Sequence, residues 1–386
     1  MKLKSLFCKF KSGLILIRDY FILMYTYKVN FSPHNQHSPT VLFNVSDVRM
    51  GSYYYGLMSY FERAGYNLIL RHHFWFIANC NTRNKIVLFS LKRLLITCSF
   101  PQNSASILYV HDHLNERLDK LQWKKKIYIN ADSFQFFLDK VPLSEKEFIM
   151  PFSLHPVIAH NHKKLDFQSF RNSITRKFRI TFSGTNSLET YNSDLLPNYF
   201  HKLSLYQTLE AIKNNLNANE LYILNETDAL SNGGYKNVFL LNDLSQKGSK
   251  YIPPSEWLKY LASVDFFLAC PGIKMPMCYN TSEAMSVGTI LITEYPEFFY
   301  PPLKHMKNCI AYHGEKDLID KIKLVLSLNK ETIDLLRENV LNYYNAYLKG
   351  ESFVRQIEKS NHHQLTLYLQ ATDVSLPKYI ENRVRI

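Results

Sequence analysis

A single carboxylate, Glu283, stands in the stretch MPMCYNTSEAMSVGTILITEYPEFFYPP, near the start of a short apolar segment. The surrounding pattern predicts a strand (264–270), a Pro271-Gly272 turn, a loop, a helix (281–287) that Gly288 ends, and a second strand (289–293). In such a βαβ unit the loop and the helix N-terminus lie at the carboxyl edge of the sheet, where open α/β sheets bind ligands. Glu283 is therefore a candidate ligand-binding residue.

Two roles are open to Glu283. The first backbone N–H groups of the helix, from Thr281, Ser282 and Glu283, favour a phosphate, and the Thr281 and Ser282 hydroxyls add donors. A carboxylate in this first turn can also accept hydrogen bonds from the vicinal hydroxyls of a ribose. Alternatively, Asn280 as N-cap and Glu283 at the third helical position form a capping box, which needs no ligand. Spacing alone favours the cap.

Strand-like runs rich in Val, Ile, Leu and Phe alternate with helical segments along the chain. This alternation predicts an α/β fold of two Rossmann-like domains, with parallel sheets and a cleft between the domains as the default ligand site. The boundaries that we expect are a basic extension (1–35), an N-terminal acceptor domain (36–160), a C-terminal donor-binding domain (175–345), and a C-terminal helix and tail that packs back on the first domain (346–386).

Composition narrows the class of protein. Lys and Arg exceed Asp and Glu by 46 − 33 = 13 in 386 residues, which favours anionic partners. The six cysteines are scattered without a C-x-x-C pair, so we expect no metal, no disulfide framework and a cytoplasmic location. The basic residues are dispersed and no nucleic-acid motif appears, so we expect no nucleic-acid partner.

The stretch from Val264 to Leu326 resembles the donor-binding half of glycosyltransferases of the GT-B fold, most nearly exostosin-like and bacterial surface-polysaccharide enzymes. The resemblance covers roughly residues 250–330. It is carried by Pro271, Gly272, Glu283, Ala284, Gly288, Asn308 and the helix from about Lys316. It implies that Glu283 binds the donor ribose and that no metal or other cofactor is required.

One departure and one further match concern the donor site. Many exostosin-like sequences carry a basic residue three positions before this Glu, where Asn280 stands here, and Lys274 is a substitute from the loop. The strand and Gly turn in KFRITFSGTNS resemble the first strand of the family's donor domain, and the resemblance implies that Gly184, Thr185 and Asn186 lie beside the donor diphosphate. A plain β–α connection is the alternative for that turn.

Catalytic candidates stand at strand ends in the first half of the chain. They are Asp47 in FNVSD, His111 and Asp112 in YVHDH, and Asp132 in INAD. An inverting transferase needs a general base near the acceptor hydroxyl, and His or Asp can serve. For each of these residues a hydrogen-bonded strand terminus is the alternative.

The N-terminal segment MKLKSLFCKFKSGLILIRDYFILMYTYK is basic and apolar, but Arg18 and Asp19 interrupt it, so we expect no spanning helix. It is either an amphipathic or disordered extension or a segment that rests on an anionic membrane at its inner face. The sequence thus predicts a glycosyltransferase acting on a nucleotide-sugar donor and a glycan or lipid-linked glycan acceptor. The alternative is a non-catalytic nucleotide- or glycan-binding protein of the same fold.

Overall fold

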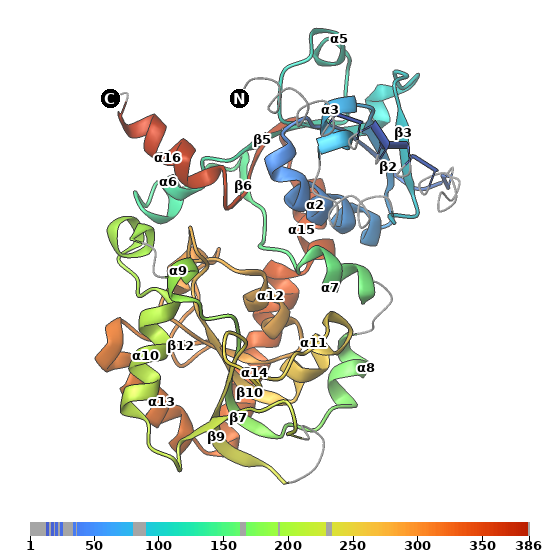
Figure 1. Ribbon diagram of the computed structural model, residues 1–386. Coiled ribbons are helices and arrows are strands. Elements are labelled where there is room, and N and C mark those ends of the chain that lie inside the picture. The colour runs from blue at the N-terminus through green and yellow to red at the C-terminus, as the bar shows by residue number, and fades with distance from the viewer. Residues whose placement is uncertain are drawn as a thin grey trace. The chain divides into compact units, whose positions relative to one another are not determined.

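The computed structural model describes residues 13–14, 17–18, 20–21, 24–25, 34–35, 37–79, 90–162, 167–191, 194–228 and 234–384 (Figure 1). The chain divides into two compact units. Unit 1 comprises 1–136, 140–150 and 350–386, and unit 2 comprises 137–139 and 151–349. Each unit holds one parallel sheet with helices, which confirms the predicted α/β class.

Unit 1 is built on seven strands in the order β3-β2-β1-β4-β5-β13-β6. The strands are β1 (Thr40–Asn44), β2 (Asn67–Arg71), β3 (Leu94–Thr97), β4 (Ile107–His111), β5 (Lys125–Asn130), β6 (Glu147–Ile149) and β13 (Gln364–Tyr368). The helices are η1 (Val48–Met50), α2 (Gly51–Arg63), α3 (Phe74–Asn79), η2 (Ser104–Ser106), α5 (Glu116–Asp119), α6 (Phe134–Phe137), α15 (Gly350–Lys359) and α16 (Ser375–Val384).

The sequence pattern located β1, β2, β4 and β5 but missed β3, β6 and β13. β13 comes from the C-terminal part of the chain and pairs in parallel with both β5 and β6. The helix that precedes it, α15, packs on α2, where Gly350 lies directly against the Tyr60 ring. The apolar run KIVLFS (85–90), which by its composition also predicts a strand of this unit, lies outside the described residues, except for Ser90.

Unit 2 is built on six strands in the order β12-β11-β10-β7-β9-β8. The strands are β7 (Phe178–Gly184), β8 (Leu221–Ile223), β9 (Lys236–Asp243), β10 (Val264–Ala269), β11 (Ile290–Thr293) and β12 (Ile310–Ala311). The longer helices are α10 (Leu205–Asn215), α11 (Pro254–Ala262), α12 (Tyr279–Ser286), α13 (Gly314–Ser327) and α14 (Lys330–Tyr343). The short ones are α7 (Pro156–Asn161), α8 (Phe167–Asn172), α9 (Leu188–Tyr191), η3 (Leu196–Phe200), η4 (Pro296–Phe298) and η5 (Tyr344–Leu348).

Helices cover both faces of the unit 2 sheet. Figure 1 shows α10 and α13, which contact each other, on one face and α11 on the other. Crossover direction explains this division, because right-handed connections place α10 and α11 on opposite sides when successive strands are added in opposite directions. The strands β7 and β10 are buried almost throughout, as expected for a parallel sheet with two covered faces.

Two helices end just before a glycine, and the end at Gly288 confirms the prediction for that helix. α2 ends at Arg63, and Gly65 beyond it has a φ of +92°. α12 ends at Ser286, and Gly288 has a φ of +74°. Because L-residues with a side chain rarely adopt positive φ, these two positions favour glycine and fix where each helix stops.

Candidate functional site

Each sheet reverses its strand order at one point, and ligands of open α/β sheets bind at the carboxyl ends of the strands there. In unit 1 the reversal lies between β1 and β4, and in unit 2 between β7 and β10. Asn44 pairs with His111 at the first point, and Gly184 and Ala269 end the strands at the second.

The unit 1 edge is organised by Asp112. Its carboxylate accepts hydrogen bonds from the backbone N–H groups of Ser46 (2.8 Å) and Asp47 (2.9 Å) and from the Tyr54 hydroxyl (2.8 Å). Burial opposes ionisation of this carboxyl, but these donors together with His113 hold its pKa below the ordinary value. Asp112 is thus an ionised residue that fixes the loop after β1.

His113 is the side chain that Asp112 orients. Its Nδ1 lies 2.5 Å from an Asp112 carboxylate oxygen, and its side chain is 37% exposed against 8% for Asp112. Nε2 lies 3.4 Å from the Asn44 side-chain amide nitrogen, which is a donor, so an acceptor hydroxyl has to replace Asn44 at the Nε2 lone pair. When Asp112 holds a proton on Nδ1, the neutral imidazole keeps a lone pair on Nε2, which is the state of a general base.

The two other predicted catalytic residues at this edge are occupied by structural contacts. His111 is buried, its ring stacks on Tyr109 at 4.7 Å, and burial lowers its pKa. Asp47 caps the short helix η1 and forms an ion pair with Arg49 at 2.7 Å. The sequence offered all three residues of His111, Asp112 and His113 at this strand end and favoured the first two, together with Asp47, whereas the geometry favours His113. Alternation of side chains along the strand distinguishes His113 from Asp112 but not from His111.

Asp132 lies at the carboxyl end of β5 in the same unit. It is buried, and one carboxylate oxygen accepts a hydrogen bond from the Asn382 amide at 2.7 Å. The C-terminal helix α16 therefore contacts this strand end. The structure does not bring Asp132 into contact with the Asp112–His113 pair through any bond among the described residues.

In unit 2, Glu283 is buried at 3% exposure inside α12. One carboxylate oxygen accepts from the backbone N–H of His155, the N-cap of α7, at 2.9 Å. The other accepts from the Trp257 indole of α11 at 2.6 Å. Burial raises the pKa of Glu283 to about 7, although both hydrogen bonds act in the opposite direction. Glu283 thereby ties together three helices.

The predicted capping box is wrong. α12 begins at Tyr279, its N-cap is Cys278, and no side chain caps it. Asn280 is therefore the second helical residue and Glu283 the fifth, two residues beyond the third position that a capping box requires. The prediction from spacing failed because the helix begins two residues earlier than expected, at a cysteine N-cap that the usual capping residues do not indicate.

The predicted phosphate-binding hydroxyls of α12 also have partners within the protein. The Thr281 hydroxyl donates to the Cys278 carbonyl at 2.7 Å, the Ser282 hydroxyl donates to the Phe152 carbonyl, and both residues are buried. The N–H groups nearest the helix start belong to Tyr279 and Asn280, since α12 begins two residues earlier than expected. The Asn280 side-chain oxygen is buried and has no hydrogen-bond partner in the described structure.

The turn after β7 holds the other donor-site candidates. Gly184 ends β7, and its carbonyl accepts from Leu244 N–H at 2.9 Å, so Thr185 and Asn186 follow at the carboxyl edge. Asn186 is 7% exposed, and among the described residues its side-chain oxygen has no hydrogen-bond partner. A buried amide oxygen without a partner is costly, so this position suits a polar ligand or water.

Lys274 and Asn308 differ in their placement. Lys274 is exposed in the loop between β10 and α12. Asn308 precedes β12, and its amide oxygen accepts from Lys304 N–H at 2.7 Å. Asn308 therefore closes a local turn, whereas Gly184 ends β7, Thr185 follows it, and Lys274 lies in the loop after β10.

Glu294 is a residue of this edge that sequence reasoning missed. It follows β11, is 3% exposed, and accepts from Leu203 N–H at 2.7 Å and Gly314 N–H at 2.8 Å. Glu294 thus binds the first N–H group of α13 and the N–H group of Leu203, two residues before α10 begins. A carboxylate directly after a buried strand was the available signal.

In comparisons with known proteins, no family model and no curated protein matches the chain. Solved structures similar to it include a glycosyltransferase from Rickettsia africae ESF-5 (11% identity, 83% of this chain, 97% of that chain, TM-score 0.43). Another is Anabaena HepE in complex with UDP (10% identity, 83% of this chain, 98% of that chain, TM-score 0.43). A third is WaaG, a glycosyltransferase involved in lipopolysaccharide biosynthesis (9% identity, 84% of this chain, 100% of that chain, TM-score 0.38).

Proposed function

We propose that the chain is a glycosyltransferase that moves a sugar from a nucleotide-sugar donor to a glycan or lipid-linked glycan acceptor, in the synthesis of a surface polysaccharide or lipopolysaccharide. The observation that carries the proposal is the pairing of Asp112 with His113 at the strand reversal of unit 1. An oriented, half-exposed imidazole suits the activation of a hydroxyl group. The carboxyl edge of the unit 2 sheet offers backbone N–H groups, polar side chains and a lysine, which suit the diphosphate of the donor.

At the unit 2 edge the donor diphosphate would lie against backbone N–H groups. The start of α12 at Tyr279 and Asn280 offers such groups together with the positive end of the helix dipole. Thr185, Asn186 and the cationic Lys274 stand on the two neighbouring loops. These groups would stabilise the diphosphate as negative charge develops on the leaving group.

Glu283 remains the proposed ribose ligand. In the structure its carboxylate is satisfied by His155 N–H and the Trp257 indole. Binding of a ribose therefore requires that a sugar hydroxyl replaces the indole as donor to one carboxylate oxygen. The His155 contact can persist, since it uses the other oxygen.

In unit 1, His113 would act as the general base of an inverting transfer. Its Nε2 takes the proton from the acceptor hydroxyl, the acceptor oxygen forms the new bond to the anomeric carbon, and the bond from that carbon to the nucleotide diphosphate breaks. Asp112 acts as a positioning residue, because it fixes the ring and stabilises the imidazolium that forms.

The experiment is to incubate the full chain with a panel of nucleotide sugars and measure release of free nucleotide. Slow release with one donor, abolished in His113→Ala but retained in His363→Ala, is the expected result. His363 is a matched control because it is an exposed histidine of the same unit. Tight binding of a nucleotide sugar without any release would instead favour the alternative, a non-catalytic binding protein.

Peripheral attachment to an anionic membrane is a further part of the proposal. Leu14, Ile17, Phe21 and Tyr25 have helical spacing, and each is at least 47% exposed. Tyr20, on the same segment, donates to or accepts from His72 at 2.7 Å and packs against Phe74 at 5.0 Å between ring centroids. None of the helices formed by the described residues is long and apolar enough to cross a bilayer.

Charge supports the same attachment. Residues 1–35 contain six Lys or Arg and one acidic residue, Asp19. Each basic residue near an anionic surface contributes about 1 kcal/mol of attraction. In flotation with anionic liposomes, a variant lacking residues 1–30 should stay in the dense fraction while the full chain floats. Equal flotation of the full chain and the shortened variant would show that residues 1–30 do not attach the protein to the membrane.

A further inference from the structure

Exposed apolar side chains follow the carboxyl ends of four neighbouring strands of unit 1, β3, β2, β1 and β4. They are Phe100 after β3, Phe74 and Trp75 after β2, Val48 after β1, and Leu114 after β4, and we call them the apolar edge. Among the described residues that precede these strands at the opposite edge, no large apolar side chain is exposed. Such a one-sided grouping is typical of a surface that binds a protein or a membrane.

The helix α3 holds Trp75 outward on a packed base. Trp75 is 63% exposed, whereas the next residue, Phe76, is buried with its ring 5.8 Å from the Tyr54 ring. Tyr54 in turn donates its hydroxyl to Asp112, the residue that orients His113. A large aromatic side chain left in water contributes little to folding, so packing within unit 1 does not account for the position of Trp75.

The N-terminal segment reaches the same edge. Tyr20 is hydrogen-bonded at 2.7 Å to His72, the residue after β2, and its ring lies 5.0 Å from the Phe74 ring. The exposed Phe21 ring lies 5.6 Å from that of Tyr20. The exposed apolar side chains of the N-terminal segment therefore continue onto α3, which lies outside residues 1–30.

The net charge of the chain is concentrated in the part that builds this edge. Lys and Arg are spread evenly along the chain, but acidic residues are scarce before β5. Residues 1–111 contain 13 Lys or Arg and 3 Asp or Glu, a balance of 13 − 3 = +10 out of +13 for the whole chain. Residues 67–106 contain five Lys or Arg and no acidic residue. An apolar edge within such a region matches an anionic bilayer, at whose interface aromatic side chains are enriched.

Arg71 places a cation among the aromatic rings of this edge. It is the last residue of β2, and its guanidinium carbon lies 4.6 Å from the centre of the Phe100 ring. A guanidinium binds the phosphate of a lipid headgroup, while aromatic rings beside it contact the carbon chains below. The two kinds of side chain therefore suit the two layers of a bilayer interface.

We propose that the apolar edge docks on the interfacial region of an anionic phospholipid bilayer, with the Trp75 indole at headgroup depth. Strands of a sheet lie about 4.8 Å apart, so the ends of β2 and β4 are separated by about 10 Å, and Leu114 is the residue next to His113. A saccharide carried by a lipid would thus reach His113 with its anchor in the membrane. That consequence rests on the proposed function, whereas the docking does not depend on transferase activity.

Tryptophan fluorescence tests the docking in the full chain. Of its three Trp residues, Trp75 is exposed, Trp123 is buried and Trp257 is half-buried. Vesicles of phosphatidylcholine and phosphatidylglycerol with brominated acyl chains should quench part of the emission at a lipid concentration at which the whole sample floats. Trp75→Phe keeps an aromatic ring, so it should still float but should lose that quenching. Unchanged quenching in Trp75→Phe, flotation of the wild type without quenching, or no flotation would overturn the proposal.

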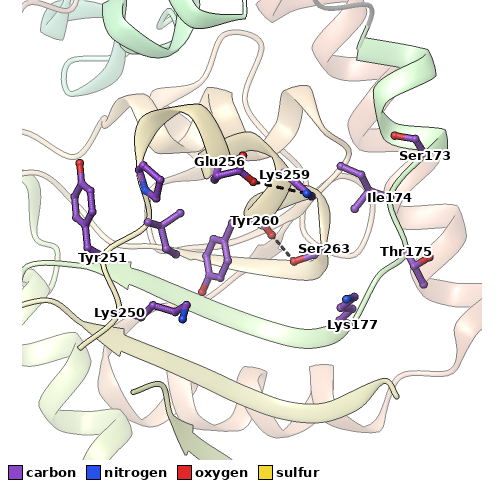
Figure 2. Close-up of a pocket in the computed structure, with 12 residues that line it drawn as sticks. Ser173, Ile174, Thr175, Lys177, Lys250, Tyr251, Glu256, Lys259, Tyr260 and Ser263 are labelled. Atoms are coloured by element: carbon purple, nitrogen blue, oxygen red, sulfur yellow. Dashed lines mark hydrogen bonds and ion pairs between the residues drawn. The ribbon is translucent and has the colours of Figure 1, made fainter. Parts of the chain in front are cut away.

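Loss of the aromatic ring should weaken binding. Trp75→Ala should need about tenfold more lipid for half-maximal flotation, because one aromatic side chain no longer enters the interface. The matched control is Tyr251→Ala, since Tyr251 belongs to unit 2 and is 70% exposed. Figure 2 shows its ring at one end of a cavity of about 610 Å³ beside α11. The control should float like the wild type, and equal weakening of both variants would contradict a docking role for α3.

A second copy of the chain is the other occupant that the apolar edge could bury. Sedimentation without lipid distinguishes the two, and we expect a sedimentation coefficient that Trp75→Glu leaves unchanged. A dimer that Trp75→Glu dissociates would overturn the bilayer proposal. Flotation should also decrease as salt is added or as phosphatidylglycerol is replaced by phosphatidylcholine. Absence of nucleotide release from every nucleotide sugar concerns only the proposed function.

Discussion

The imidazole of His113 lies 2.5 Å from the carboxylate of Asp112, and Asp112 in turn holds two backbone N–H groups and a tyrosine hydroxyl. The buried carboxylate thereby fixes the orientation and the protonated nitrogen of a half-exposed histidine. The two residues are adjacent in the sequence but differ in role, because one side chain turns inward and the other toward solvent.

The first prediction separates base from positioning residue. His113→Ala should reduce transfer by about 10²–10⁴-fold, the usual contribution of general base catalysis, while UDP affinity and thermal stability stay unchanged. His113→Gln keeps a polar side chain of similar reach without a base and should be as inactive. Activity of either variant close to the wild type would contradict the assignment.

A second prediction concerns Asp112 itself. Asp112→Asn should lower both activity and the free energy of unfolding, the latter by about 1–3 kcal/mol, because several donors lose an ionised acceptor. The pKa of Asp112 is lowered in the folded chain, so its contribution is present above the ordinary value of 3.8 and is lost as pH falls below it. Denaturant titrations between pH 3 and 6 should show this loss in the wild type and a smaller one in the variant.

The third prediction follows from the raised pKa of Glu283. Between the ordinary value of 4.5 and the folded value of about 7, the folded chain binds more protons here than the unfolded chain does. Stability contributed by this group should therefore be greatest below pH 4.5 and fall as pH rises to 7, by about 3 kcal/mol in total. Glu283→Gln removes the titration, so the unfolding free energy of that variant should vary less with pH over this range.

Glu297→Gln is the matched control for that experiment, since Glu297 is a nearby carboxylate whose side chain is 42% exposed. It should retain the pH dependence of the wild type. A pH profile of Glu283→Gln that is indistinguishable from the wild type would show that the carboxylate does not titrate in this window.

A fourth prediction distinguishes the two roles of Glu283. Trp257→Phe keeps an aromatic ring against Tyr260 but removes the indole N–H that occupies one carboxylate oxygen. If that oxygen binds ribose, UDP affinity should be equal or higher in Trp257→Phe and about tenfold lower in Glu283→Ala. Parallel loss of UDP affinity and stability in both variants would instead show that Glu283 only connects helices.

The fifth prediction tests Glu294. Its carboxylate accepts from Leu203 N–H and Gly314 N–H while buried, so Glu294→Ala leaves two donors without partners. We expect a loss of about 2–4 kcal/mol in unfolding free energy, measured by denaturant titration. A change below 0.5 kcal/mol, roughly the level of surface substitutions, would show that water replaces the carboxylate at no cost.

Sequence alone determined the parallel α/β pattern and several strand and helix ends. Buried strands such as VDFFLA are mostly apolar, and Gly65 and Gly288 mark helix ends because positive φ favours glycine. These features are local, so spacing and residue type are sufficient to read them.

Tertiary structure decided what each polar side chain contacts. Glu283 faces His155 and Trp257, which are 128 and 26 residues away in the chain, and no spacing rule predicts such partners. The same holds for β13, which completes the unit 1 sheet from the other end of the sequence. Hydrogen-bond partners and strand neighbours depend on how distant segments pack, whereas periodicity records only which face of an element is buried.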